Sequence, residues 1–576
     1  MNFVTSPVLN LRLPVWRSRV LVLLFLAGFL ALGARAAFLQ GWDNDFLRAK
    51  GESRYSRVVE ISANRGRISD RNGELLAIST PVKSIRAARG EIKFEGEQLA
   101  RLGSLLGMPG EDIQRRIASG ENDFVYLKRQ ISPEVADQIA ELRIPGLFQS
   151  REYRRYYPGG EVMAHVIGFT GAEDTGQEGI ELAFQGELAG KPGSRRVIRD
   201  RMQQIVEDME LIKPAEDGRD LTLSIDARIQ SNAFSQLSAA LEAHRAKAAA
   251  VLVLDVVTGE VLALVNLPTY NPNNKSKRAG AQLRNRALTD TFEPGSTMKP
   301  FTIALALEEG RVRPDTVIQT APGKLIIGRA TVSDAHPLGA LSVAQVLQKS
   351  SNVGTSKIAL SLTREDMWEM FSRSGFGVVP QVSFPGAVSG KLRPHKTWRP
   401  IEQVTMSYGY GLSVSLFQLA QAYTIFARDG EMAPVSFIKN AGPAAGRKVI
   451  SAETARAVRA MLEAAAGPGG TAPRAQIMGY RVAGKTGTAH KVEGSGYASH
   501  KYRASFVGFA PVSNPRLVVA VTVDEPSAGK HYGGDVAAPV FARIMEGALR
   551  SLGVAPDAPM KPVELPPSSE RIEESI

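Results

Sequence analysis

The stretch Phe292-Glu-Pro-Gly-Ser-Thr-Met-Lys-Pro-Phe301 says most about the fold of this 576-residue chain and about its reactive side chains. Glu293-Pro-Gly295 predicts a turn, and Ser296 can open a helix that continues through an apolar run to a stop at Gly310. Positions i and i+3 share one face of a helix, so the amine of Lys299 can reach the hydroxyl of Ser296. We therefore expect a buried, apolar helix that begins with a serine nucleophile and its lysine base.

A lysine works as a base near neutral pH only if its charged form is disfavoured. Burial beside the positive end of a helix dipole has that effect, so Lys299 is expected to work unprotonated. The alternative is a solvated lysine on an ordinary helix, because the same spacing also occurs at Ser436–Lys439 and Ser527–Lys530. Only Ser296 is followed in order by two further motifs, which favours it over the other two serines.

The second motif is Ser350-Ser351-Asn352, which stands between two stretches typical of short helices, 342–348 and 353–360. A loop between two helices can face a cleft. There Ser350 can relay a proton to a leaving amine, and Asn352 can hydrogen-bond a substrate amide. The alternative is a plain helix cap, a position that serine and asparagine both favour.

The third motif is Lys485-Thr486-Gly487-Thr488, which predicts a short strand in which Gly487 lets another backbone approach closely. A peptide can lie along such an edge, where Lys485 and the hydroxyls of Thr486 and Thr488 attract a terminal carboxylate. An oxyanion hole needs two backbone N–H groups, most naturally those of Ser296 and Thr488. The alternative is a surface strand that carries a lysine.

The three motifs, their order and their surroundings resemble the penicilloyl-serine transferases, and specifically the class B penicillin-binding proteins. The resemblance covers most of the chain after residue 218 and is carried by Asp220–Asp226, Val253–Gly259, Tyr270–Pro272, Phe292–Phe301, Ser407–Gly411, Gly484–Thr488, Tyr532–Gly534 and Ala537–Pro539. It implies an α/β (α+β) penicillin-binding transpeptidase fold, in which helices flank an antiparallel sheet. Local patterns agree, because Ala250–Asp255 and Glu260–Val265 predict a hairpin, and Arg516–Val523 predicts a later strand.

The segment before the transpeptidase region resembles the non-catalytic N-terminal module of the same class, on the residues Arg65–Ala77, Tyr157–Gly160, His165–Gly168 and Gln177–Glu181. A charged, proline-containing stretch, Lys213–Arg219, marks the boundary. We predict a cytoplasmic N-terminus over residues 1–19, a transmembrane anchor over 20–39, a connecting segment over 40–57, an elongated pedestal (dimerisation-type) domain over 58–217, a transpeptidase domain over 218–553 and a flexible proline-rich tail over 554–576.

The apolar run Val20–Leu39 can span a bilayer if Arg35 snorkels to the interface. Basic residues precede it at Arg12, Arg17 and Arg19, which places the N-terminus in the cytoplasm and the rest of the chain in the periplasm. We therefore expect a single-pass protein of the inner membrane. The alternative is a cleaved signal peptide, because Ala34-Arg35-Ala36 resembles a cleavage site.

The resemblance implies serine acyl transfer on peptidoglycan stem peptides that end in D-Ala-D-Ala. Ser296 attacks the carbonyl between the two D-alanines, the last D-alanine leaves, and an amine from a neighbouring stem takes the acyl group. β-Lactams, which look like acyl-D-Ala-D-Ala, acylate the same serine. The alternatives are a D,D-carboxypeptidase or β-lactamase-like hydrolase and a non-catalytic β-lactam sensor or scaffold. The anchor and the large N-terminal module favour the polymer-building enzyme.

Within the class, the division type is favoured over the elongation type. The features in its favour are the short loops around Ser350, the run Ser407–Gly411, and Ala36–Gln40 after the anchor. The division type implies a place at the septum, beside a SEDS-family glycan polymerase of the FtsW type and other divisome proteins.

Composition narrows the remaining possibilities. The chain has 70 basic and 58 acidic residues, a net charge of +12 that is modest for its length, so we expect no nucleic-acid partner. Its lack of cysteine excludes a disulfide framework and a cysteine nucleophile. The seven histidines show no ligand-like spacing, so neither a metal nor a cofactor is expected.

Overall fold

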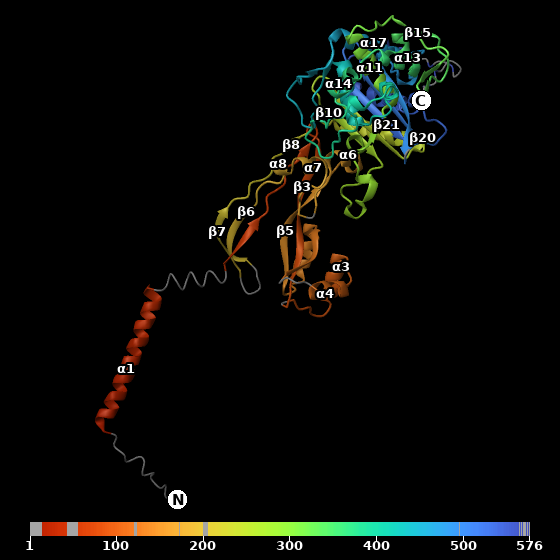
Figure 1. Ribbon diagram of the computed structural model, residues 1–576. Coiled ribbons are helices and arrows are strands. Elements are labelled where there is room, and N and C mark those ends of the chain that lie inside the picture. The colour runs from red at the N-terminus through yellow and green to blue at the C-terminus, as the bar shows by residue number, and fades with distance from the viewer. Residues whose placement is uncertain are drawn as a thin grey trace. The chain divides into compact units, whose positions relative to one another are not determined.

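The computed structural model describes residues 14–42, 56–90, 92–119, 124–171, 173–199, 205–494 and 496–563, with residues 565, 567, 572 and 574. Packing divides the chain into two discontinuous units (Figure 1). The first comprises Met1–Ala63, Pro81–Glu152 and Lys191–Glu216, and the second comprises Asn64–Thr80, Tyr153–Gly190 and Asp217–Ile576. The linear boundaries given above stay a prediction. Much of the predicted N-terminal segment, of the connecting segment and of the tail lies outside the described residues.

The first unit contains a small sheet and a helical cluster. The sheet is antiparallel and three-stranded, with the order β1 (Ser56–Ile61), β6 (Gly193–Arg199), β7 (Ile205–Lys213). The cluster consists of β4 (Phe124–Ile131), α3 (Gln98–Leu106), α4 (Gly110–Ser119), α5 (Pro133–Glu141), β5 (Leu147–Tyr156) as far as Glu152, and the second half of β3 (Leu75–Ala88). Apolar residues such as Ile85, Leu102 and Leu127 are fully buried between these elements, so the cluster has its own core.

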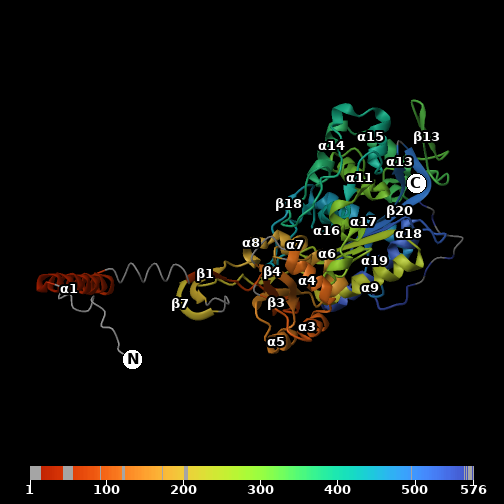
Figure 2. The same ribbon diagram turned by 90° about the horizontal axis from the view of Figure 1, so that it is seen from below.

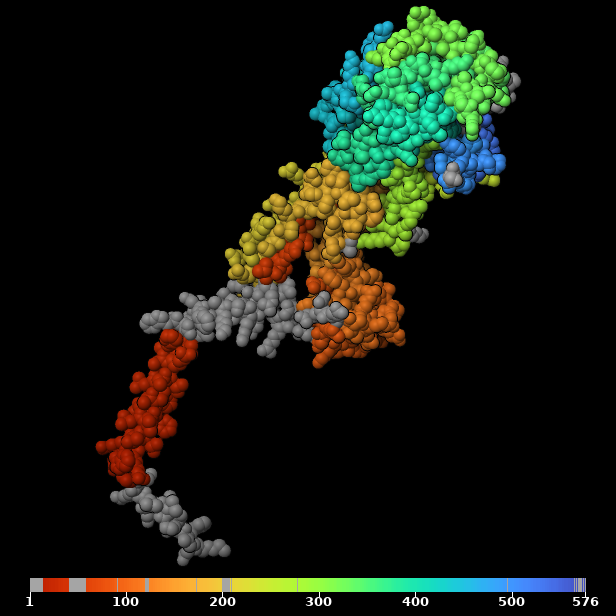
Figure 3. Space-filling view, in the orientation of Figure 1, coloured from red at the N-terminus to blue at the C-terminus, as the bar shows by residue number. Residues whose placement is uncertain are grey.

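The N-terminal helix α1 (Val15–Ala37) continues into the short π-helix η2 (Phe38–Trp42). The stretch Val15–Gln40 is long and apolar enough to cross a membrane, with a mean hydropathy of 2.2. None of the residues of α1 is buried, and its side chains are exposed along the red helix in Figure 3. The predicted apolar span is therefore a helix, which begins before residue 20, at Val15 directly after Pro14. A signal sequence would have the same form, so that alternative stays open.

The second unit is built on a five-stranded antiparallel sheet. Its order is β10 (Val261–Leu267), β9 (Ala248–Asp255), β21 (Leu517–Asp524), β20 (Gly496–Ala510), β19 (Ala483–Glu493). Every residue of β9, β10 and β21 is buried, so both faces of the sheet are covered. The predicted hairpin and the predicted later strand are both confirmed.

Helices cover the two faces of this sheet, as the resemblance implied. On one face lie α9 (Ala227–Ala243) and α19 (Ala538–Ser551), and on the other lie α16 (Leu416–Ala427) and α17 (Ala452–Ala466) (Figure 2). Alternate residues of β9 accordingly enter different cores: Leu252 joins the cluster that contains α16, and Val251 joins the cluster that contains α9 and α19.

Shorter elements complete the second unit. They are β2 (Ile68–Ser69), α6 (Gly160–Ile167), α7 (Gly179–Ala183), α8 (Gln185–Leu188), β8 (Leu221–Thr222), η3 (Lys275–Lys277), η4 (Gly280–Leu283), α10 (Arg286–Thr289), β11 (Thr291–Phe292), η5 (Gly295–Met298), α11 (Lys299–Glu308), β12 (Val317–Gln319), β13 (Lys324–Ile327), β14 (Ala330–Ser333), β15 (Ala340–Ser342), α12 (Val343–Gln348), α13 (Asn352–Leu360), α14 (Arg364–Arg373), η6 (His395–Thr397), α15 (Pro400–Ser407), β16 (Val414–Ser415), β17 (Glu431–Met432), β18 (Arg447–Lys448), η7 (Pro473–Ala475) and α18 (Gly533–Val536).

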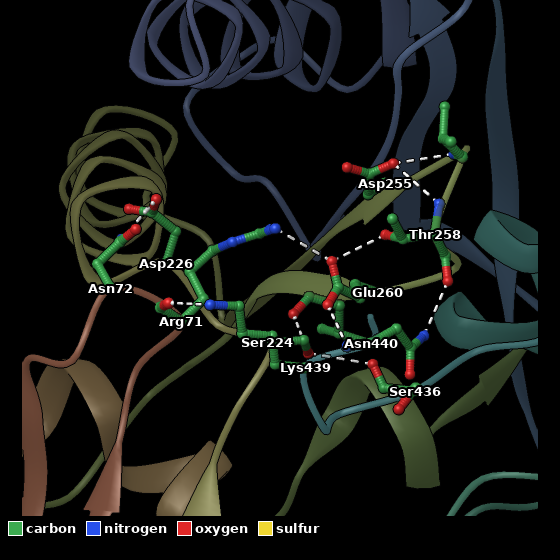
Figure 4. A network of polar contacts seen from close by, with 12 residues as sticks. Arg71, Asn72, Ser224, Asp226, Asp255, Thr258, Glu260, Ser436, Lys439 and Asn440 are labelled. Atoms are coloured by element: carbon green, nitrogen blue, oxygen red, sulfur yellow. Dashed lines mark hydrogen bonds and ion pairs between the residues drawn. The ribbon is translucent and has the colours of Figure 1, made fainter. Parts of the chain in front are cut away.

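The β9–β10 hairpin is held by acidic side chains at its turn (Figure 4). One carboxylate oxygen of Asp255 accepts hydrogen bonds from the backbone N–H groups of Val257 and Thr258, at 2.9 and 3.2 Å. The buried carboxylate of Glu260 accepts from the Thr258 hydroxyl at 2.8 Å and forms an ion pair with Arg71 at 3.2 Å. These contacts hold the turn beside β10, the edge strand on the side of the sheet opposite β19.

The Ser436–Lys439 pattern belongs to the same network and has a structural use. The amine of Lys439 donates to the carbonyl of Arg71 at 2.9 Å, and the hydroxyl of Ser436 donates to the carbonyl of Ile438 at 2.9 Å. The other pattern, at Ser527, is exposed, and its hydroxyl donates to the carbonyl of Arg245. In both patterns the serine hydroxyl therefore donates to a backbone carbonyl.

A second buried network lies in the segments that precede the transpeptidase region. Glu181, which is fully buried, receives Arg65 at 2.6 Å on one carboxylate oxygen and Arg155 at 2.7 Å on the other. Arg65 also donates to the side chain of Gln185 at 2.8 Å. One carboxylate thus pairs with two buried guanidinium groups, an arrangement that is strongly destabilised when a single partner is removed.

We expect Glu181→Gln to destabilise the second unit by about 3–5 kcal/mol, because it removes the carboxylate that forms ion pairs with two buried arginines. The measurement is thermal unfolding of the purified full chain, in which the melting temperature of the variant should fall by several degrees. Glu187→Gln is the matched control, because Glu187 is exposed on the neighbouring helix. Equal melting temperatures for the two variants would contradict the structural role given to Glu181.

Candidate active site

Ser296 lies in a tight turn directly before a buried helix. The turn is the 3-10 helix η5, and α11 begins at Lys299 rather than at Ser296 as the sequence suggested. The reason is local: Gly295 has a φ of +58°, and Pro300 at the start of α11 favours a helix that begins there. Gly310, with a φ of +66°, follows the end of α11, so the predicted stop is confirmed. Ser296 is 4% exposed and Lys299 is fully buried.

Glycines let the serine turn approach the edge strand β19. A Cβ atom at Gly487 would lie 2.7 Å from the carbonyl oxygen of Pro294 and 2.6 Å from the hydroxyl of Ser505, so only glycine fits. On the other side, a Cβ atom at Gly409 would lie 2.1 Å from the carbonyl oxygen of Gly295. The close approach predicted for Gly487 is confirmed, and it brings the third motif against the first.

The amine of Lys299 contacts the second motif. It donates to the carbonyl oxygen of Ser350 at 2.5 Å and to the hydroxyl of Ser350 at 3.0 Å. Burial lowers the pKa of Lys299 well below its ordinary value of 10.5, and the charge of Lys485 lowers it further. The nearby carboxylates of Asp334 and Glu574 raise that pKa and so oppose the shift. The pKa of Lys299 is therefore shifted in the direction that a general base requires, and the serine whose hydroxyl it contacts is Ser350.

Ser350 occupies a sharp turn between the two predicted helices, which the structure places at α12 and α13. Its φ is +59°, a left-handed conformation that a residue other than glycine seldom adopts. The hydroxyl of Ser351 accepts from the backbone N–H of Gly354 at 2.8 Å and so caps α13. The motif is therefore a helix cap, as the alternative proposed, and it also holds Ser350 against Lys299.

Asp334, which the sequence did not single out, anchors this turn. Its carboxylate accepts from the hydroxyl of Ser351 at 2.7 Å and from the backbone N–H of Asn352 at 2.6 Å. It also accepts from the N–H of Val353 at 3.0 Å. A capping carboxylate is normally found within a few residues of its helix. Asp334 stands 17 residues before Ser351, after β14, so no local pattern marks it.

The side-chain amide of Asn352 has an unsatisfied oxygen. Its amide nitrogen lies 3.4 Å from the carbonyl oxygen of Ser333. Its side-chain oxygen is buried and has no hydrogen-bond partner among the described residues. A buried acceptor without a partner costs free energy, about 1–3 kcal/mol, which a substrate N–H would recover.

Lys485 is buried on β19 among threonine hydroxyls. Its amine donates to the hydroxyl of Thr486 at 3.1 Å and lies 3.5 Å from that of Thr471. The two threonine hydroxyls also contact each other at 2.9 Å. Thr471 is a further site residue that no motif indicated, because it lies 14 residues before Lys485, in the segment between α17 and β19. Burial lowers the pKa of Lys485 to about 8, and the carboxylate of Glu574 raises it.

Lys299 and Lys485 both have a lowered pKa, and the charge of one affects the other. Both are fully buried, and two positive charges close together disfavour each other. The pKa of Lys299 lies well below 10.5 and is lowered by Lys485, whereas the pKa of Lys485 is about 8. With a pKa of about 8, Lys485 is mostly protonated at neutral pH, and its positive charge disfavours protonation of Lys299.

We expect Asp334→Ala to slow acylation by a labelled penicillin about tenfold, because the turn that holds Ser350 against Lys299 loses its anchor. Loss of the cap should also lower the free energy of unfolding by about 1–2 kcal/mol. Labelling that is quenched at a series of times measures the acylation rate, and thermal unfolding of the same samples measures the change in stability. Asp315→Ala, at an exposed carboxylate on the same connection, is the control. A variant that is destabilised but acylated at the normal rate would contradict the positioning role.

The fold and the site together define a class of protein: a serine acyltransferase built on a sheet between two helical layers, with a buried lysine one turn after the serine. The chain matches the family described as "Penicillin binding protein transpeptidase domain" over residues 249–546 and "Penicillin-binding Protein dimerisation domain" over residues 60–223. It belongs to this family and has its transpeptidase fold. The two domains in one chain make it a class B penicillin-binding protein and a serine-type transpeptidase.

Individual relatives match nearly end to end. The chain is 43% identical over 536 residues to "Probable peptidoglycan D,D-transpeptidase PenA" of Neisseria meningitidis serogroup B, covering 92% of both chains. It is 41% identical over 549 residues to "Peptidoglycan D,D-transpeptidase FtsI" of Escherichia coli K12, covering 94% of this chain and 93% of that one.

Two solved structures show the same architecture. One is the transpeptidase domain of penicillin-binding protein 3 from Burkholderia pseudomallei, with 53% identity and a TM-score of 0.55 over 58% of this chain and 98% of that one. The other is a peptidoglycan synthetase from Bifidobacterium adolescentis, with 25% identity and a TM-score of 0.70 over 88% of this chain and 99% of that one.

Proposed function

We propose that this protein cross-links peptidoglycan stem peptides at the division septum, with Ser296 as the nucleophile that β-lactams also acylate. The peptidoglycan D,D-transpeptidase activity follows from the family and from the relatives named above. One observation carries the assignment of residues: a buried Lys299, whose pKa is lowered well below 10.5, follows Ser296 by one turn and contacts Ser350, while a buried Lys485 lies on the adjoining strand.

Acylation begins with proton transfer from Ser296. A neutral amine has two N–H groups and one lone pair. The two contacts to Ser350 can use both N–H groups of Lys299, which leaves the lone pair for the proton of Ser296. Ser296 then attacks the carbonyl between the two D-alanines, and the backbone N–H groups of Ser296 and Thr488 stabilise the oxyanion. The C–N bond breaks, and D-alanine leaves with a proton passed on through Ser350.

Substrate recognition uses the remaining residues of the site. The unpartnered oxygen of Asn352 accepts an N–H of the stem peptide. The charge of Lys485 and the hydroxyls of Thr486 and Thr488 attract the terminal carboxylate, while the peptide lies along β19. An amine from a second stem then attacks the ester, which frees Ser296 and forms the cross-link.

The anchor and the N-terminal module support a role in building the wall rather than in hydrolysis. α1 is long enough to hold the chain in the inner membrane, with the catalytic unit in the periplasm. In that position the natural source of new glycan is a membrane polymerase of the SEDS family, of the FtsW type, working with other divisome proteins. The identity to FtsI of E. coli supports the division type over the elongation type.

The test combines a product assay with localisation. Purified full chain, given lipid-linked or polymerised peptidoglycan, should form cross-linked dimers in excess over hydrolysed pentapeptide. Hydrolysis alone would indicate a carboxypeptidase. A fluorescent fusion should gather at midcell in dividing cells, and an even signal along the sidewall would indicate the elongation type. Complementation of a depleted strain by the Ser296→Ala protein would instead favour a scaffold.

A further inference from the structure

The carboxylate of Glu574, near the end of the chain, lies inside the candidate site. Glu574 is only 3% exposed, which is unusual for a glutamate in a stretch rich in proline and charge. One of its carboxylate oxygens accepts from the hydroxyl of Thr488 at 2.6 Å. The other accepts from the backbone N–H of Gly534 at 3.1 Å.

The two donors form a receptor that matches a carboxylate. The hydroxyl of Thr488 accepts from the N–H of Gly533 at 2.9 Å, so its own proton is directed at Glu574. The close packing of Gly533 against Gly487 fixes this geometry, since a Cβ atom at Gly533 would lie 2.8 Å from the carbonyl oxygen of Gly487. The charge of Lys485 is close enough to interact with Glu574, because Glu574 raises the pKa of Lys485. Thr488 and Gly534 thus supply two directed hydrogen bonds, and Lys485 supplies a cation.

The proposed substrate needs the same partners. Its terminal carboxylate is expected on Lys485 and the hydroxyl of Thr488, and a hydroxyl has one proton to donate. Glu574 and the substrate therefore cannot both occupy the receptor. A β-lactam carries a carboxylate too, so it faces the same competition.

We propose that Glu574 is an intramolecular competitor of the acyl donor, which holds the carboxylate receptor of the free enzyme until substrate or a partner displaces it. This inference rests on the proposed function. A group tethered to the same chain acts at a high effective concentration, so even a weak contact can occupy the site for most of the time. The apparent affinity for substrate is then reduced by the fraction of enzyme in which the receptor is open.

The same contact has a second effect on the base. The negative charge of Glu574 raises the pKa of Lys299, which favours its protonated and inactive form. The carboxylate of a substrate in the same receptor acts on Lys299 in the same way. Displacement of Glu574 therefore ends the competition for the receptor and leaves a negative charge near Lys299.

The test is the kinetics of acylation of the full chain by a fluorescent penicillin. Glu574→Ala and Glu574→Gln should lower the apparent dissociation constant at least about threefold, with the limiting acylation rate unchanged, because competition affects binding only. Glu573→Gln is the matched control, since it makes the same change in charge one residue away and should behave as wild type. A soluble peptide with the sequence of residues 571–576 should inhibit the Glu574→Ala enzyme, and its Glu-to-Gln version at position 574 should not.

The outcomes separate this inference from the proposed function. Wild-type rates in both Glu574 variants, or equal effects of Glu573→Gln, would overturn the competition while leaving Ser296 as the acylated residue. Failure of the penicillin to label wild type and the Glu574 variants alike would overturn the proposed function and the inference together.

Discussion

Ser296→Ala is expected to abolish covalent labelling by a fluorescent penicillin and to lower cross-linking by at least about 10³-fold. The reason is that no other hydroxyl of the site can replace the nucleophile and form the ester. Ser350 is held by Lys299 in a left-handed turn, and the hydroxyls of Thr486 and Thr488 contact Thr471 and Glu574. Gel fluorescence of the denatured protein measures the labelling, because only a covalent adduct survives denaturation.

The chain supplies matched controls for this substitution. Ser436→Ala and Ser527→Ala change serines with the same spacing to a lysine, but the structure uses both hydroxyls for hydrogen bonds to backbone carbonyls. Both variants should be labelled at the wild-type rate. Persistent labelling of Ser296→Ala, or loss of labelling in either control, would contradict the assignment of Ser296 as the nucleophile.

Lys299→Met is expected to reduce the acylation rate by about 10²–10⁴-fold, the usual contribution of a positioned general base. Methionine keeps much of the length of the side chain but has no lone pair that can take the proton of Ser296. In the wild type, acylation should slow as the pH falls through the lowered pKa of Lys299, because protonation removes the same lone pair. Lys530→Met, at the exposed Ser527 pattern, is the control. A wild-type rate that does not fall in acid would contradict a lysine base.

Lys299→Met should also stabilise the fold. The direction of this effect follows from the number of protons that the folded and unfolded states bind. Between the lowered pKa of Lys299 and its ordinary value of 10.5, the unfolded state carries a proton that the folded state lacks. Wild-type stability therefore rises with pH across this window, and the full penalty is present below the folded-state pKa. Lys299→Met removes the penalty, so its melting temperature should exceed that of the wild type at neutral pH. A lower melting temperature would indicate that packing of the amine outweighs its desolvation.

Much of the site could be predicted from the sequence because its chemistry is local. The i, i+3 spacing of Ser296 and Lys299, the loop of Ser350 between two helical stretches and the strand at Lys485 each follow from a few neighbouring residues. The fold-defining hairpin and strand were predictable for the same reason, since continuous apolar runs indicate strands that are covered on both faces. The start of α11 was placed three residues too early, because turn geometry depends on Gly295 and Pro300 more than on serine as a cap.

The rest depends on residues that are distant along the chain. Asp334, Thr471 and Glu574 carry no motif, and each reaches the site from a separate loop or from the tail. Their effect is electrostatic and directional, so it exists only once the fold brings them within hydrogen-bond distance.

By itself, the sequence determined the order of the three motifs, the serine and lysine chemistry that they specify, the apolar N-terminal span and the family. The tertiary structure decided that the pKa of both lysines is lowered, because that depends on burial and on the charges that surround each amine. It also decided that the side chain of Glu574 lies in the site, where it contacts Thr488. The physical reason is the same in both cases: desolvation and charge pairing are properties of positions in space, and the spacing of residues along the chain does not encode them.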